Sequence, residues 1–208
     1  MSISQNPMTG EMRQSMANFV TTVCRGQNII KAKVFKPRNV NSIAQQLQRA
    51  SFKLIVEAYD SFGGITDDGF PGRPKTFSPY NAFVKANLGS AIDKSGGVPM
   101  IDYSKLIVSE GSLPVVGVVD ATIGATGITL TYETDTDTPK ELASDQIVAF
   151  VKTTKGSLKV ARQVRGKQAV TPLLISSPGI TAADVVCCYV FAVNAEGTKV
   201  SNSVHVEI

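Results

Sequence analysis

The sequence contains no tryptophan, a single histidine and only three cysteines among its 208 residues. Serine–histidine and cysteine–histidine catalysis both need a histidine base beside the nucleophile. His205 instead stands between Val204 and Val206, in a segment that predicts a strand position. A structural zinc site needs about four closely spaced Cys, His or acidic ligands, and a phosphate loop needs a Gly-rich turn before Lys and Ser or Thr. Neither pattern occurs, so the sequence predicts a non-enzymatic protein with no catalytic residue, cofactor or metal.

Long apolar runs are missing as well. Residues 1–20 lack the apolar core of about 7–15 residues that a signal peptide requires. No stretch approaches the roughly 18–20 apolar residues of a membrane span. We therefore expect synthesis in the cytoplasm and no membrane span. The adjacent Cys187 and Cys188 would point to opposite faces of a strand, so we expect two small buried residues, not a redox switch.

Acidic residues are scarce in the first half of the chain. Residues 1–100 hold 12 Lys or Arg against 6 Asp or Glu, whereas residues 101–208 hold 9 against 11. This asymmetry indicates an anionic neighbour, which is nucleic acid, an acidic protein surface or a membrane. The alternative is a solvated strand face, because Lys31 and Lys33 alternate with apolar residues. Phe35 is the one aromatic residue there that offers base stacking.

Two strands and a helix are predicted after a flexible tail of residues 1–16. Residues 19–24 and 29–35 form a hairpin whose turn is Arg25–Asn28, with Gly26 and Asn28 at positive φ. A helix begins with the capping box of Ser42 and Gln45 and ends near Tyr59. Its apolar face is formed by residues at steps of three and four, namely Ile43, Leu47, Ala50 and Leu54.

The next segments predict a loop, a second helix and a strand. Residues 61–77 are rich in Gly and Pro, which indicates an exposed loop and a contact surface. Ser78 as N-cap and Pro79 at the first helical position begin the helix, which ends before residue 95. Alternation over residues 101–109 then predicts a strand.

From about residue 113 the pattern is entirely β. Seven candidate strands are separated by turn residues, at residues 115–120, 127–133, 146–153, 157–163, 168–174, 184–194 and 198–207. This spacing is typical of a sandwich or barrel. The final hairpin, with Tyr189 on a long strand and Ser201-Asn202-Ser203 on the closing strand, resembles a fibronectin type III or immunoglobulin-like domain. The expected fold is mainly β, with an α+β region at 17–112 and a β-sandwich at 113–208.

Several stretches between residues 36 and 208 resemble an uncharacterised family of Bacteroidota and their phages. They are Lys36-Pro37-Arg38-Asn39, Ala44-Gln45-Gln46-Leu47-Gln48-Arg49-Ala50-Ser51-Phe52, Tyr80-Asn81-Ala82 before Asn87-Leu88, Ile101–Ser109 with Gly111-Ser112-Leu113, Ala195-Glu196-Gly197 and Val200-Ser201-Asn202-Ser203-Val204. The opening hairpin departs from the family, whose members begin with a Gly- and aromatic-rich hairpin. The family has no established activity, so the resemblance implies an architecture and a taxonomic setting that includes phages, but it implies no mechanism.

These observations lead to the hypothesis of a virion structural protein, in a capsid accessory, vertex or tail position, that contacts other virion proteins and copies of itself. The expected interaction residues are Arg25, Lys31, Lys33, Lys36, Arg38, Phe70, Arg73 and Lys75. Two alternatives remain, a glycan- or receptor-binding surface module and a nucleic-acid packaging protein. The alternating carboxylates of residues 134–138 suggest a Ca²⁺ loop less strongly than a solvated turn, because an EF-hand-like loop needs a Gly and a distal Glu in register.

Overall fold

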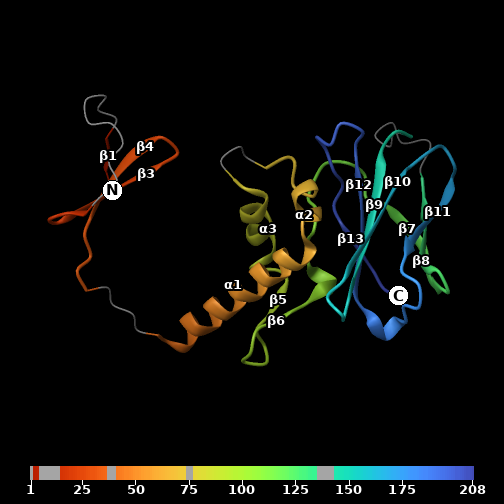
Figure 1. Cartoon of the computed structure of the whole chain (residues 1–208), viewed down its shortest axis with the longest axis horizontal. Helices are drawn as coiled ribbons and strands as arrows, with labels where there is room; N and C mark the ends of the chain where they lie inside the picture. The colour runs from red at the N-terminus through yellow and green to blue at the C-terminus, as the bar shows by residue number, and fades with distance from the viewer. Residues whose placement is uncertain (1, 5–14, 37–40, 74–76, 135–142) are drawn as a thin grey trace. The chain divides into compact units, whose positions relative to one another are not determined.

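The computed structural model describes residues 2–4, 15–36, 41–73, 77–134 and 143–208. The chain is mainly β, with several antiparallel sheets and a few helices (Figure 1). It divides into two compact units, Met1–Ser42 and Ile43–Ile208. Over the described residues, no helix is long and apolar enough to cross a membrane. The expected boundary near residue 112 does not coincide with this division.

The first unit is one sheet with the strand order β1-β4-β3-β2. Its strands are β1 (Ser2–Ser4), β2 (Ser15–Met16), β3 (Phe19–Cys24) and β4 (Gln27–Ala32). Cys24 pairs with Gln27, so Arg25 and Gly26 alone form the hairpin turn. Their φ angles of 53° and 75° fit a two-residue turn of this kind. The predicted hairpin is present, but Asn28 lies within β4 opposite Val23 and not in the turn.

The second unit opens with three helices, α1 (Ile43–Phe62), α2 (Ile65–Asp68) and α3 (Pro79–Asn87). The first helix extends beyond the predicted end, and its buried face is Ser51, Ile55, Ala58 and Phe62. Ile43, placed on the apolar face by the sequence, is 77% exposed. The third helix begins as predicted, because the Ser78 side chain accepts a hydrogen bond from the Asn81 N–H and Pro79 occupies the first position. It ends earlier than expected, at Asn87.

Two predictions in this region are wrong. Residues 61–77 are not simply an exposed loop, because they include α2 and bury Ile65 and Phe70. The expected strand at 101–109 is also absent. The short strands β5 (Ile92–Asp93) and β6 (Met100–Ile101) pair with each other, and a 3₁₀ turn, η1 (Tyr103–Lys105), follows. The Asp102 carboxylate accepts from the Ser104 N–H and caps this turn, which ends the extended backbone.

All seven strands expected after residue 113 are present, and two of them, β8 and β9, have the predicted ends. They are β7 (Gly117–Gly124), β8 (Gly127–Glu133), β9 (Gln146–Thr153), β10 (Leu158–Val164), β11 (Val170–Ser176), β12 (Val185–Val193) and β13 (Val204–Val206), with a 3₁₀ turn η2 (Ala182–Asp184) before β12. One sheet has the order β10-β9-β12-β13 and the other β11-β8-β7. The last strand is shorter than the predicted 198–207, although Val200 and Ser201 form isolated bridges.

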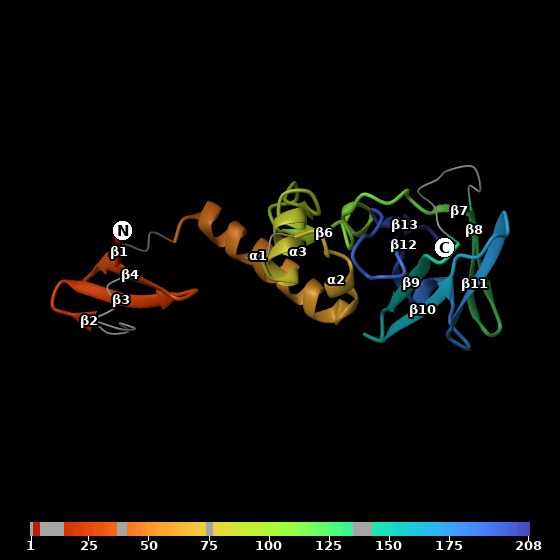
Figure 2. The same ribbon diagram turned by 90° about the horizontal axis from the view of Figure 1, so that it is seen from above.

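Within the second unit, the β10-β9-β12-β13 sheet lies between two layers. The β11-β8-β7 sheet covers one of its faces and the helices cover the other (Figures 1 and 2). One core joins the two sheets through residues such as Leu130, Ala149 and Val190. A second core joins the helices to the outer face through Phe62, Phe83, Phe150 and Tyr189, among others. The helices therefore share a core with the β10-β9-β12-β13 sheet.

Burial on both faces explains the continuous apolar sequence of β12. Cys187, Tyr189 and Phe191 face the helices, whereas Cys188 and Val190 face the other sheet. The sequence alternation predicted this division for residues 187–193. It fails for Val185 and Val186, because a β-bulge between Val185 and Cys187 exchanges their faces.

A short extended segment, residues 108–113, joins the helical layer to the β12–β13 connection; we call it the strap. The Ser109 hydroxyl donates to the Ser201 carbonyl at 2.8 Å, and the Val108 N–H donates to the Ser203 hydroxyl at 3.0 Å. Two close approaches require glycine. A Cβ at Gly69 would lie 2.2 Å from the Val108 carbonyl oxygen, and one at Gly111 would lie 2.0 Å from that of Val200.

Candidate functional site

The basic residues expected to make contacts lie on the sheet of the first unit. Arg25 is in the β3–β4 turn, Lys31 is on β4, and Lys33 and Lys36 follow that strand. All four side chains are exposed. The Lys33 ammonium lies 5.5 Å from the centre of the Phe35 ring, so the basic surface carries an aromatic side chain as well. Arg38 lies outside the described residues.

This sheet buries very little of its own surface. Among the residues of Met1–Ser42 whose side chains the structure describes, Thr21 and Asn28 are buried, and both are polar. Three large apolar side chains are exposed by more than half, Phe19 at 55%, Val34 at 72% and Phe35 at 67%. A sheet normally buries one apolar face against another layer. The first unit therefore presents apolar and basic groups together.

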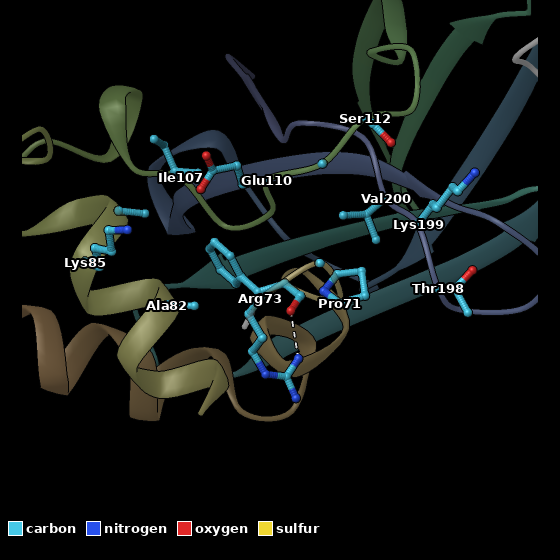
Figure 3. Close-up of a pocket in the computed structure, with 14 residues that line it drawn as sticks. Pro71, Arg73, Ala82, Lys85, Ile107, Glu110, Ser112, Thr198, Lys199 and Val200 are labelled. Atoms are coloured by element: carbon cyan, nitrogen blue, oxygen red, sulfur yellow. Dashed lines mark hydrogen bonds between the residues drawn. The ribbon is translucent and has the colours of Figure 1, made fainter. Parts of the chain in front are cut away.

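The second unit carries a pocket of about 690 Å³ (Figure 3). Its walls come from the loop after α2, from α3, from the strap and from the segment before β13. Phe70, Ala82 and Val200 contribute apolar surface to it. The volume lies in the range of pockets that hold ligands or short peptide segments.

The sequence placed Phe70 and Arg73 in a contact loop, and both line this pocket. Their roles differ. Phe70 is only 4% exposed and packs edge-on against Phe83, so it belongs to the core and is not a projecting contact. The Arg73 guanidinium donates to the Phe70 carbonyl at 2.7 Å, which holds its charge at the pocket wall. Lys75 lies outside the described residues.

Three further charged residues of the pocket were not found from the sequence. Lys85 is in the last turn of α3, Lys199 precedes β13 and Glu110 belongs to the strap. All three side chains are exposed. Each comes from a different element, so no local motif connects them. Together with Arg73 they give three cations against one carboxylate, and the pocket favours anionic groups.

The cysteines and the histidine lie outside this pocket. Cys187 and Cys188 are buried and free, and burial raises the pKa of each thiol to about 12. A thiol in this state is neither a nucleophile nor a metal ligand at neutral pH. His205 is half-buried on β13, and its ring centre lies 5.3 Å from that of Tyr189.

Metal-ligating side chains do not gather in the described ranges, where no group of three His, Cys, Asp or Glu residues is placed to hold an ion. The alternating carboxylates considered for Ca²⁺, Asp135 and Asp137, lie outside those ranges. Two features of the described residues offer surfaces for binding, the sheet of the first unit and the pocket of the second.

No curated protein and no solved structure matches the sequence. A family model described as "Family of unknown function (DUF6266)" matches residues 11–207. The match includes most of the first unit and nearly all of the second, with the strap and every residue of the pocket. The chain is therefore a member of the DUF6266 family.

Proposed function

We propose that this protein is a non-enzymatic structural component of an assembled particle and acts through protein–protein contacts. The observation that carries the proposal is the sheet of Met1–Ser42, which presents Phe19, Val34 and Phe35 to solvent and buries only Thr21 and Asn28 among the side chains that the structure describes there. A small sheet with three or more strands gains independent stability by packing an apolar face. A contact with another copy or another protein supplies the missing layer.

The charges on the same sheet select the partner. The sequence of Met1–Ser42 holds six Lys or Arg and one Glu. Exposed apolar groups within a basic surface favour a partner whose contact face is apolar with an acidic rim, since burial supplies affinity and opposite charge supplies orientation and rate. The second half of the chain is net acidic, so another copy is one such partner.

The second unit is the folded body that this contact attaches to the particle. Its two sheets, with the orders β10-β9-β12-β13 and β11-β8-β7, support a fibronectin type III-like sandwich. The tight turns, the antiparallel pairing and the final hairpin agree with that fold, while the helical layer on the four-stranded sheet is an addition to it. A rigid sandwich is suited to repeated display in a symmetric assembly.

We place the particle as a bacteriophage virion, in a capsid accessory, vertex or tail position. The support is the resemblance of residues 36–208 to proteins of Bacteroidota and their phages. Mass spectrometry of purified particles is the direct test. The protein should be present in fixed stoichiometry with the major structural proteins, and its absence from washed particles would exclude this setting.

One observation favours nucleic-acid packaging as a second candidate. The Lys33 ammonium lies over the exposed Phe35 ring, so the basic sheet offers a cation and an aromatic ring side by side, as proteins that bind single-stranded nucleic acid do. Nucleic-acid binding through this surface would weaken steeply with salt. It would also weaken when Lys31, Lys33 and Lys36 are replaced by glutamine. If the triple variant binds single- and double-stranded DNA as the parent chain does, this candidate fails and the protein-contact proposal stands.

A further inference from the structure

The pocket between α3, the strap and the segment before β13 has a charge that its own neighbours do not neutralise. Arg73, Lys85 and Lys199 line it, and none of them forms an ion pair with a carboxylate of the described residues. Glu110, the acid of the pocket, forms none there either. A concave surface with this excess of positive charge attracts a ligand that carries several carboxylates.

Close backbone contacts and hydrogen bonds hold the residues of the pocket wall in place. Gly111 approaches the Val200 carbonyl too closely for any side chain, and the Gly111 N–H donates to the Asn202 side chain at 3.1 Å. The Arg73 guanidinium is held by the Phe70 carbonyl at 2.7 Å. Positions fixed in this way reduce the ordering cost of binding. The pocket is thus prepared for a ligand whose charges and apolar groups match it.

The chain itself contains the required acidic sequence. Between Lys105 and Lys140 there are five Asp or Glu residues and no Lys or Arg. Three of these acids, Glu133, Asp135 and Asp137, occur at every second position. These three carboxylates match the three cations of the pocket in number and are opposite to them in charge.

We propose that this pocket binds the acidic stretch 133–137 of a second copy of the chain. Arranged about a two-fold axis, this contact occurs twice and closes a dimer; arranged head to tail, it generates rings or open filaments. The inference rests on the proposed assembly function and assigns a second contact to it, separate from the sheet of the first unit.

Charge reversal on each side of the contact tests this assignment in the full chain. The pocket variant is Lys85→Glu with Lys199→Glu, and the stretch variant is Asp135→Lys with Asp137→Lys. Lys94→Glu with Lys159→Glu is the matched control, since it reverses two exposed lysines away from the pocket. Sedimentation velocity over a concentration series in 150 mM NaCl measures the association of each.

We expect the pocket variant and the stretch variant each to weaken association at least about tenfold, while the control leaves it unchanged. An equimolar mixture of the two variants should regain the parental species, because each reversed surface then meets an opposite charge. This recovery also shows that both variants are folded. Equal association in all samples, or no recovery on mixing, would overturn the inference.

The result separates this contact from the proposed sheet contact. Substituting Phe19 and Phe35 removes the sheet contact and leaves the recovery on mixing, if the pocket assignment is correct. Recovery that disappears in 500 mM NaCl is expected, since exposed ion pairs are screened. A chain that is monomeric at all concentrations, with or without charge reversal, would exclude a pocket filled by a second copy.

Discussion

The Asn87 side chain pairs with the backbone of Ile107 as a neighbouring strand would. Its amide nitrogen donates to the Ile107 carbonyl at 2.8 Å, and its oxygen accepts from the Ile107 N–H at 2.7 Å. The same nitrogen donates to the Phe83 carbonyl at 2.9 Å. Asn87 is fully buried, so these bonds fix the end of α3 to the segment that leads into the strap.

Replacing Asn87 with alanine should therefore destabilise the second unit. The substitution removes this partner from the N–H and the carbonyl of the partly buried Ile107, which costs about 1–3 kcal/mol in the free energy of unfolding. Urea denaturation followed by circular dichroism measures the change. Asn81→Ala, at an exposed position of the same helix, is the control and should change the free energy by less than about 0.5 kcal/mol. Equal effects of the two substitutions would contradict the assigned role.

Gly111 tests the close contact between the strap and the segment before β13. In Gly111→Ala the new methyl group would lie 2.0 Å from the Val200 carbonyl oxygen, so the strap must move. Overpacking of this kind costs about 1–3 kcal/mol. Gly96→Ala is the matched control, because its methyl group would meet no atom within 4 Å. A melting temperature lowered in the control as much as in Gly111→Ala would refute the steric argument.

The three thiols should react very differently. Cys24 is exposed, whereas burial raises the pKa values of Cys187 and Cys188 to about 12 from an ordinary value of 9.0. Ellman's reagent at pH 8 should therefore modify one thiol per folded chain, and all three after denaturation. The sign for stability follows from the same values. Above pH 9 the thiols ionise more readily in the unfolded chain, so the free energy of unfolding falls as the pH rises toward 12. Rapid reaction of two or more thiols in the folded chain would contradict this burial.

The Asp102 carboxylate should titrate near pH 2. Hydrogen bonds from Lys105 and Ser104 lower its pKa from 3.8 to about 2, and the Lys105 ammonium lies 2.8 Å away. The stability that this carboxylate contributes is present above pH 3.8 and is lost as the pH falls toward 2. Carbon-13 NMR titration of Asp102 should show a higher midpoint in Lys105→Gln and an unaltered one in Lys94→Gln. If the Asp102 midpoint is the same in both variants, Lys105 does not lower the pKa of Asp102.

The strands after residue 113 could be predicted because local alternation and turn residues determine them. The ends of β8 and β9 and the N-cap of α3 at Ser78 follow from neighbouring residues alone. The shared core between the helices and the sheet could not be located in this way. Its signal was the sequence of β9 and β12, where apolar residues occupy both faces and so require cover on both sides.

The pocket was partly visible in the sequence and partly not. A Gly- and Pro-rich loop suggested a contact surface near Arg73, and the pocket lies there. Lys85, Glu110 and Lys199 are far apart in the sequence and meet only because the strap pairs with the segment before β13. Residues 101–109, which include the first two residues of the strap, were predicted to form one strand. Their apolar alternation does not reveal that Asp102 caps a 3₁₀ turn, or that the Ser109 and Ser203 side chains make hydrogen bonds in place of backbone pairing.

The proposed assembly through the sheet of Met1–Ser42 is tested most directly by sedimentation velocity of the full chain with Phe19→Ser and Phe35→Ser. These side chains are 55% and 67% exposed, so their loss should leave the fold intact and remove the apolar contact. Val98→Ser with Met100→Ser is the control, because these residues are 70% and 64% exposed in the second unit. The account predicts that the parent chain and the control associate in a concentration-dependent way and that the Phe19 and Phe35 variant loses that contact. A parent chain that remains monomeric at high concentration, or a variant that associates as the parent does, would contradict it.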